Sequence, residues 1–239
     1  MESGSYGAVD GTELKLDIFR PEQANGTTIV FFFGGGWRDG TTEQFHPQCL
    51  YLNDYGLIGI SAEYRVRSRH GTSIPEAVAD ARELMNWFIE HGESLKINTD
   101  RLIVGGGSAG GQLALCTAFD SPLVPQALVL FNPVYDTSLK RIADMIPSEL
   151  VEKYSPQHNV GPGFPPTILF HGTKDNIVPF SLAEKFTKKM EEYDNYCELV
   201  AFKDEQHAFF NYGQNENKAF KKTMEDTVNF LNVLGLIKT

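Results

Sequence analysis

Short apolar runs alternate with longer amphipathic segments along most of the 239 residues. The apolar runs have the length of buried strands, and the segments between them repeat apolar residues at helical spacing. This alternation favours a largely parallel sheet with helices on both faces, built as a single domain over residues 1–239. The expected strands cover residues 14–20, which alternate like an edge strand, and residues 28–33, 57–62, 101–105, 127–131, 167–171 and 197–202.

The best-signalled helix follows the third of these strands. Ser73 can cap a helix that has Pro75 and Glu76 in its first turn, and Gly92 ends it. Apolar residues between these signals recur at steps of three and one and form a single stripe. Further helices are expected at residues 109–118, 179–193 and 216–234.

Residues 135–166 interrupt the alternation of strands and helices. A connection of this length inside a compact domain is usually functional, so we interpret the segment as a lid or a pocket wall. The alternative is a packed surface insertion without a role.

Composition and charge exclude several classes of function. The formal net charge is −10, and no cluster of Lys and Arg offers the basic surface that a nucleic-acid partner requires. No apolar stretch reaches the length of about 18 residues that a membrane-spanning helix needs, so we expect no membrane partner. The three cysteines, Cys49, Cys116 and Cys197, fit neither a disulfide framework nor a metal site.

The first residues show no basic region followed by an apolar one, so we expect no secretory leader in this sequence. A cytoplasmic location is therefore the default expectation, and a secreted or periplasmic location applies if a leader has been removed. The sequence leaves a homodimer open.

The strongest chemical signal is a glycine-rich turn between an expected strand and an expected helix. Residues 105–111 read Gly-Gly-Gly-Ser-Ala-Gly-Gly and contain the pattern G-x-S-x-G with Ser108 at its centre. This pattern places the serine on a strained corner, where small neighbours let other backbone pass close by. A phosphate-binding loop is the alternative, but Gln112 and Leu113 stand where the Walker pattern needs Lys and Ser or Thr. The turn therefore predicts Ser108 as a nucleophile.

A second glycine run, Gly34-Gly35-Gly36, follows an early strand and precedes Trp37. Consecutive glycines cost conformational entropy, so they usually serve a close backbone approach or a positive φ. A tetrahedral intermediate needs two or three amides directed at its oxygen. We expect Gly35 and Gly36 to supply them together with Ala109, and Trp37 to wall the acyl pocket.

The general base and its partner are expected at the carboxyl ends of later strands, where sites in doubly wound sheets gather. His207 lies between the last strand and the last helix and is the predicted base. His171 ends a strand directly before a glycine and is expected to be structural. Asp175 is the predicted acid that orients His207, and Asp136 is the alternative. The chain order Ser108, Asp175, His207 is the order of one known serine-hydrolase fold.

These motifs together resemble the hormone-sensitive-lipase-like branch of the α/β-hydrolases, in particular compact bacterial esterases related to acetylxylan and feruloyl esterases. The resemblance spans most of the chain. It rests on residues 34–37 (Gly-Gly-Gly-Trp), 63–65 (Glu-Tyr-Arg), 106–111 (Gly-Gly-Ser-Ala-Gly-Gly), 154–156 (Tyr-Ser-Pro) and 171–175 (His-Gly-Thr-Lys-Asp), and on His207.

The resemblance implies an α/β-hydrolase fold and a serine carboxylesterase that uses no cofactor or metal. The chain departs from the family at Phe33, where the oxyanion motif usually begins with histidine. Because only about 28 residues precede the first core strand, we also expect the N-terminal helical cap of the family to be missing or to be replaced by residues 135–166. An open pocket would suit short acyl groups on bulky alcohols, such as acetyl or feruloyl esters of plant polysaccharides. A serine peptidase of the same fold and a catalytically silent ligand receptor are the alternatives.

Overall fold

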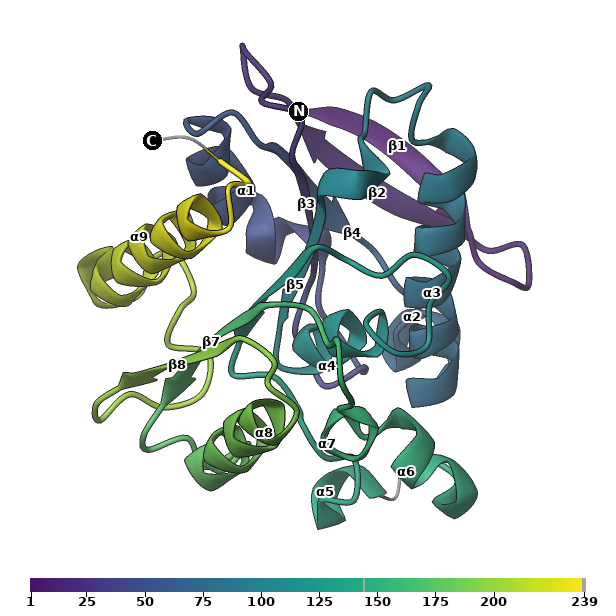
Figure 1. Cartoon of the computed structure of the whole chain (residues 1–239). Coiled ribbons are helices and arrows are strands. Elements are labelled where there is room, and N and C mark those ends of the chain that lie inside the picture. The colour runs from purple at the N-terminus through teal and green to yellow at the C-terminus, as the bar shows by residue number, and fades with distance from the viewer. Residues whose placement is uncertain (144, 238–239) are drawn as a thin grey trace.

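The structure is a computed structural model that describes residues 1–143 and 145–237. Its centre is an eight-stranded sheet with the order β1-β2-β4-β3-β5-β6-β7-β8 (Figure 1). Strands β3 to β8 are parallel, whereas β1 and β2 run antiparallel at one edge. The strands are β1 Glu2–Gly7, β2 Glu13–Phe19, β3 Thr28–Phe32, β4 Ile58–Ala62, β5 Leu102–Gly107, β6 Ala127–Phe131, β7 Thr167–Gly172 and β8 Cys197–Phe202.

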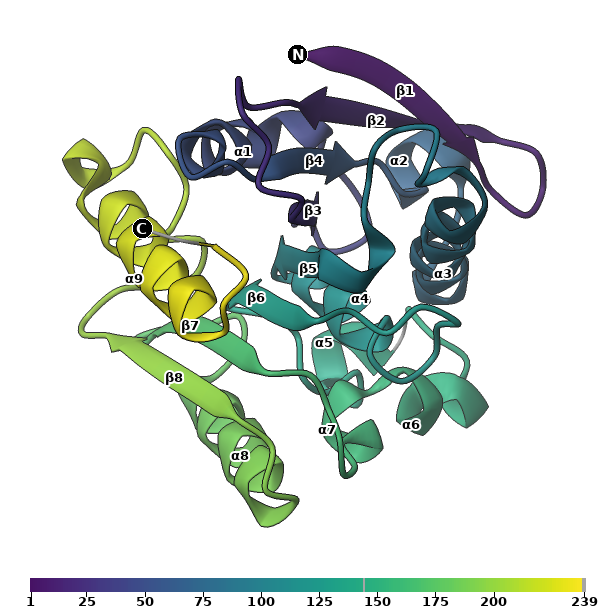
Figure 2. The ribbon, with the colours of Figure 1, turned by 45° about the horizontal axis from the view of Figure 1, so that its top comes forward.

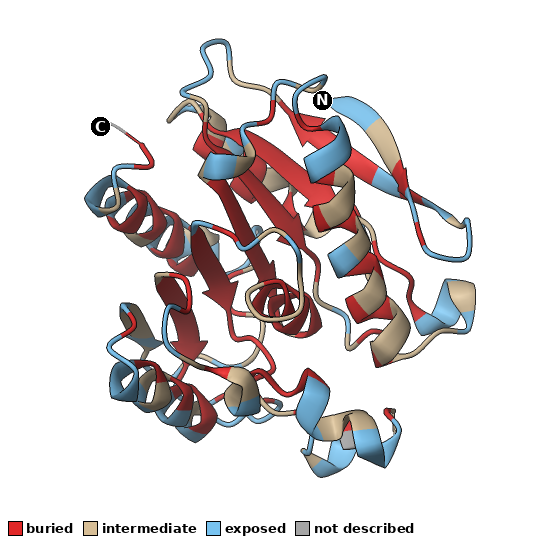
Figure 3. Ribbon diagram, turned by 45° about the vertical axis from the view of Figure 1, so that its right-hand side comes forward, coloured by how far each residue is buried: buried red, intermediate tan, exposed pale blue. Residues whose placement is uncertain are grey.

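Helices cover both faces of the sheet, as the alternating pattern predicted. Helices α1 (His46–Asn53) and α9 (Lys218–Val233) pack together on one face, and α3 (Ile74–His91), α4 (Ala109–Cys116) and α8 (Phe180–Glu192) cover the other (Figures 1 and 2). Strands β3 to β7 are buried along their whole length (Figure 3). The predicted α/β-hydrolase arrangement is therefore confirmed.

Sequence patterns located seven of the eight strands and missed β1. The segment Glu2–Gly7 is rich in polar and small residues, and it becomes a strand because it pairs with β2 in register from Glu2 opposite Ile18 to Gly7 opposite Glu13. Residues 1–27 form these two strands and their loops, so no cap helix lies there.

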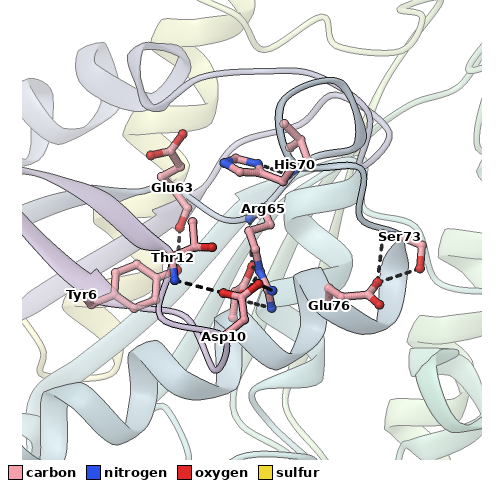
Figure 4. A network of polar contacts seen from close by, with 10 residues as sticks. Tyr6, Asp10, Thr12, Glu63, Arg65, His70, Ser73 and Glu76 are labelled. Atoms are coloured by element: carbon pink, nitrogen blue, oxygen red, sulfur yellow. Dashed lines mark hydrogen bonds and ion pairs between the residues drawn. The ribbon is translucent and has the colours of Figure 1, made fainter.

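A buried ion pair fixes this edge of the sheet to α3 (Figure 4). Arg65, just after β4, contacts Asp80 of α3 at 2.7 Å and Asp10 of the β1–β2 turn at 2.6 Å. Glu76 accepts hydrogen bonds from the backbone and the hydroxyl of Ser73, at 2.9 and 2.7 Å, which confirms the predicted start of the helix.

Residues 135–166 form short helices below α4 in Figure 1, namely α5 (Lys140–Ala143), α6 (Val151–Tyr154) and α7 (Pro156–Asn159). Residue 144 of this segment lies outside the described residues. Gln112 of α4 donates a hydrogen bond to the Tyr154 carbonyl at 2.9 Å, and Gln157 donates to the Tyr135 carbonyl at 2.8 Å. The first of these bonds attaches the segment to α4, and the second lies within the segment. Its role as a lid or pocket wall stays a prediction.

Candidate active site

Ser108 lies on the sharp turn between β5 and α4, with φ 51° and ψ −116°. The turn requires glycine on both sides of it. A Cβ atom on Gly106 would lie 2.5 Å from the Gly110 carbonyl oxygen, and one on Gly110 would lie 2.1 Å from the Phe32 carbonyl oxygen. The Ser108 amide donates to the Phe131 carbonyl of β6 at 2.9 Å, which holds the corner against the sheet. The predicted strained strand-to-helix geometry is therefore present.

The side chains of Ser108, His207 and Asp175 meet at the carboxyl ends of three parallel strands. The Oγ atom of Ser108 lies 2.8 Å from Nε2 of His207, although 99 residues separate them in the chain. The Nδ1 atom of His207 lies 2.7 Å from Oδ2 of Asp175. The Asp175 side chain is fully buried, and that of His207 is 16% exposed. The structure thus brings together the three residues that sequence reasoning selected.

Asp175 has an environment that keeps it ionised. Its Oδ1 atom accepts the backbone N–H groups of Ile177 and Val178 at 2.8 and 2.9 Å. Burial acts to raise the pKa of Asp175, but hydrogen bonds from His171 and His207 outweigh it and hold the pKa well below its usual range. A carboxylate accepts hydrogen bonds only, so Nδ1 of His207 carries the proton and Nε2 is free to accept one from Ser108.

Asp136, the alternative acid, and His171 make other contacts. Asp136 accepts hydrogen bonds from the Ser138 amide at 2.8 Å and from the Ser155 hydroxyl at 3.3 Å, and it does not contact His207. His171 is buried and contacts Asp175 at 3.2 Å. It therefore supports the acid, a role beyond the general structural one expected from its sequence position.

The glycine loop after β3 lies against the nucleophile. A Cβ atom on Gly34 would be 3.4 Å from the Cβ of Ser108. Gly35 has φ +139°, and a Cβ atom on it would lie 2.0 Å from the Asp39 carbonyl oxygen, so this position excludes larger residues. In the described part of the chain, the amides of Gly35 and Gly36 donate to no protein acceptor. Ala109 is the first residue of α4, where the amide has no partner within the helix. These three N–H groups are therefore free to bind an oxygen atom.

Two aromatic residues beside this loop are buried. The ring of Phe33 stacks on Tyr64 with centroids 4.3 Å apart, and the Tyr64 hydroxyl donates to the Phe33 carbonyl at 2.9 Å. This stacking packs the start of the glycine loop against Tyr64. Trp37 is 2% exposed, and its indole donates to Gln112 at 3.2 Å. Its indole ring is thus held next to α4, and its role as a wall of the acyl pocket stays a prediction.

Three polar residues that sequence reasoning missed surround this centre. Gln44 accepts the Gly34 amide at 2.6 Å and donates to Asn211 at 3.0 Å, so it connects the glycine loop to the segment after His207. The side chain of Asn132, at the end of β6, lies 3.4 Å from Nε2 of His207. One feature of the sequence could have indicated Asn132, namely its position directly after a buried strand. Residues at the carboxyl ends of such strands gather around sites.

An open cavity of about 530 Å³ lies beside the glycine loop. Its lining includes Gly34, Thr41, Gln44, Asn211 and Tyr212. Because Gly34 also approaches Ser108, the cavity opens next to the nucleophile. Most of its side chains are polar, so it suits a ligand with hydroxyl or carbonyl groups.

Two further classes of site are absent from residues 1–143 and 145–237. No group of three or more histidine, cysteine or acidic side chains converges there as metal ligands. No helix in these ranges is both long and apolar enough to cross a bilayer.

Two family models match the chain. The model described as BD-FAE matches residues 16–126, and that of the prolyl oligopeptidase family matches residues 75–233.

Among curated relatives, a probable carboxylic ester hydrolase, LipM, of Mycobacterium tuberculosis is 28% identical over 86% of this chain and 54% of its own length. An ethyl acetate hydrolase of Pseudomonas putida is 31% identical over 55% of this chain and 44% of its own length. The chain therefore spans about half of the length of these curated relatives.

Solved structures match over the full chain. Esterase 2 of Thermogutta terrifontis, described as a thermophilic esterase and solved with propionate bound, is 37% identical, with a TM-score of 0.93 over 100% of this chain and 96% of that chain. The same esterase with butyrate bound is 36% identical, with a TM-score of 0.90 over 99% and 95% of the two chains. Together with the match to the prolyl oligopeptidase family model, these similarities show that the chain belongs to the α/β-hydrolase superfamily, among the carboxylesterases of its hormone-sensitive-lipase-like branch.

Proposed function

We propose that this protein hydrolyses short-chain carboxylic esters through an acyl-enzyme on Ser108. The observation that carries the proposal is the continuous hydrogen-bonded series from Ser108 through His207 to Asp175, with distances of 2.8 and 2.7 Å. A serine hydroxyl is a weak nucleophile by itself, and an adjacent base held in the correct tautomer activates it.

The reaction proceeds in two acyl transfers. The Oγ atom of Ser108 bonds to the ester carbonyl carbon while Nε2 of His207 takes the hydroxyl proton. The carbonyl oxygen becomes an oxyanion, for which the free amides of Gly35, Gly36 and Ala109 are the proposed donors. The C–O bond to the alcohol then breaks, and the alcohol leaves with the proton from His207. A water molecule repeats these steps on the acyl-enzyme and releases the carboxylic acid.

The relatives support a short acyl group in the proposed substrate. Esterase 2 of Thermogutta terrifontis binds propionate and butyrate, and the Pseudomonas putida relative is an ethyl acetate hydrolase. The polar cavity beside Gly34 favours an alcohol rich in hydroxyl groups, which fits acetyl or feruloyl esters of plant polysaccharides as a narrower substrate class.

A panel of p-nitrophenyl esters from acetyl to octanoyl, with acetylated xylan and methyl ferulate, tests the proposal. We expect the wild type to prefer acetyl and butyryl esters to octanoyl esters, and Ser108→Ala to lower kcat by at least about 10⁴-fold. Ser94→Ala, which removes an exposed hydroxyl, is the matched control and should retain full activity.

Three outcomes would count against the proposal. Retained turnover by Ser108→Ala would exclude the acyl-enzyme. Faster cleavage of an aminoacyl anilide than of the esters would favour the peptidase alternative. A wild type that binds the esters without turnover would favour the silent receptor.

A further inference from the structure

Asn132 occupies a strained and fully buried position at the end of β6. Its φ is 37°, in the left-handed region that non-glycine residues seldom adopt, and its side chain has no exposed surface. The backbone amide donates to the Phe170 carbonyl at 2.8 Å, so the main chain of Asn132 is fixed to β7. Strain of this kind costs free energy and persists where the surroundings require it.

The side-chain amide of Asn132 has only one orientation that satisfies its neighbours. The Ala208 backbone N–H contacts it at 2.9 Å, and because an N–H group can only donate, the facing atom is Oδ1. The atom that faces Nε2 of His207, at 3.4 Å, is therefore the Nδ2 donor. Oδ1 of Asn132 thus binds the backbone of Ala208, the residue after His207. Its Nδ2 group points an N–H bond toward Nε2 of His207, the atom that accepts the Ser108 proton.

The two atoms of this amide act on different properties of His207. Oδ1 holds Ala208, which also has a positive φ of 63°, and so fixes the direction in which the imidazole leaves the backbone. Nε2 has one lone pair, to which Ser108 donates at 2.8 Å, so the N–H group of Nδ2 at 3.4 Å acts through its dipole. The positive end of this dipole faces Nε2 and opposes a proton there. The arrangement therefore favours the neutral form, which is the form that can act as a base.

Other groups around the imidazole come from two further segments and from the loop of His207 itself. Ser108 contacts Nε2 from the β5–α4 turn, and Asp175 contacts Nδ1 from the β7–α8 loop. Among the described residues, Asp175 is the one charged side chain in hydrogen-bond or ion-pair contact with the ring, and it favours the protonated form. Asp204 and Glu205 lie on the loop of His207, and Lys174, the exposed ion-pair partner of Asp204, lies on the β7–α8 loop. None of them makes such a contact with the ring. The effect of Asn132 at Nε2 is therefore opposite to that of Asp175 at Nδ1, since Asp175 favours the protonated ring and Asn132 the neutral one.

We propose that Asn132 is a positioning residue for the general base, which orients His207 through Ala208 and keeps its Nε2 atom unprotonated in the resting enzyme. This inference rests on the proposed function. Asn132 does not contact the substrate in this account, because it acts through His207.

The test is the pH profile of kcat/KM for p-nitrophenyl acetate with Asn132→Asp and Asn132→Ala. Asn132→Asp preserves the shape and the acceptor for Ala208 but replaces the N–H group that faces Nε2 by an oxygen atom. We expect the acid limb of its profile to move to higher pH by about one unit, because a carboxylate favours the protonated imidazole. Asn132→Ala removes both contacts, so we expect a smaller shift in the same direction and a kcat that is about tenfold lower.

Asn232→Asp, at an exposed position of α9, controls for the added charge and should follow the wild-type profile. Circular dichroism and melting curves establish whether each variant is folded. If Asn132→Asp is unfolded, the acid limb of Asn132→Ala decides the question.

Acid limbs of both variants that coincide with the wild type would overturn the inference while leaving the proposed ester hydrolysis intact. Loss of folding in both variants would assign Asn132 a purely structural role and overturn it as well. A wild type without esterase turnover would overturn the proposed function and this inference together.

Discussion

The Nε2 atom of His171 lies 3.2 Å from Oδ2 of Asp175, the same oxygen that contacts His207 at 2.7 Å. Nε2 of His171 also lies 2.9 Å from the Val178 carbonyl, so it faces two acceptors and must carry a proton. Its Nδ1 atom lies 3.2 Å from the hydroxyl of Tyr135, which therefore donates. Burial raises the pKa of Tyr135 well above its ordinary value, in agreement with a hydroxyl that stays protonated. The hydrogen-bonded series thus extends from Tyr135 to Ser108.

This contact predicts the effect of His171→Phe, which keeps an aromatic ring but removes both nitrogens. Asp175 loses one donor, and the Val178 carbonyl and the Tyr135 hydroxyl lose buried partners. We expect kcat/KM for p-nitrophenyl acetate to fall about tenfold and the free energy of unfolding to fall by about 1–3 kcal/mol, as measured by urea denaturation. His158→Phe, at an exposed position, is the control and should change neither. Wild-type kcat/KM in His171→Phe would show that His171 does not support Asp175.

The low pKa of Asp175 predicts a specific pH dependence of stability. The folded protein keeps this carboxylate ionised at a pH where an aspartate of the unfolded chain, with an ordinary pKa of about 3.9, takes up a proton. The stabilisation is therefore present above about pH 4 and is lost as the pH falls below it.

Asp175→Asn removes this titrating group. We expect its free energy of unfolding to fall less steeply with acid than that of the wild type, and kcat at neutral pH to drop by about 10⁴-fold because the imidazole loses its orienting acceptor. Asp136→Asn serves as the control, since Asp136 does not contact His207. Parallel acid-unfolding curves for Asp175→Asn and the wild type would contradict the assignment.

The glycine loop after β3 offers a comparison between neighbouring residues. A Cβ atom on Gly35 would lie 2.0 Å from the Asp39 carbonyl oxygen, whereas one on Gly36 would meet nothing within 4 Å. We expect Gly35→Ala to displace the loop and lower kcat by about 10² to 10³-fold, the effect of losing one oxyanion donor. Gly36→Ala keeps its N–H group at a φ of +63° and should cost about 1–2 kcal/mol of stability, with kcat within about tenfold of the wild type. Equal kcat values for the two variants would show that the loop does not bind the oxyanion.

Much of the fold could be predicted from local patterns, because β3 to β7 are buried on both faces and therefore appear as short apolar runs. Strand β1 could not be predicted in this way. It contains Ser3, Gly4 and Ser5, and it is extended only because β2 offers unpaired backbone groups. The helix α1 was also missed, since its apolar residues are consecutive (49–52) and form no stripe at helical spacing. It packs against β4 and α9.

Within the site, too, some residues could be predicted from local sequence, whereas others depend on contacts between distant segments. Ser108, Asp175 and His207 each follow a strand, so local sequence and topology were sufficient to select them. Gln44 and Asn132 act through side-chain contacts with residues up to 167 and 76 positions away, respectively, which no local pattern reports. Their chemistry became visible only when the strand ends were brought together.

The central claim, that Ser108 is the residue that becomes covalently acylated, is tested most directly by labelling with paraoxon followed by intact-mass and peptide mass spectrometry. We predict one phosphoryl adduct per chain, on the peptide that contains Ser108, with esterase activity lost in proportion to labelling. The adduct should be absent in Ser108→Ala and form much more slowly in His207→Ala. An inactivating adduct on any other residue, or unchanged labelling of Ser108→Ala, would contradict the account.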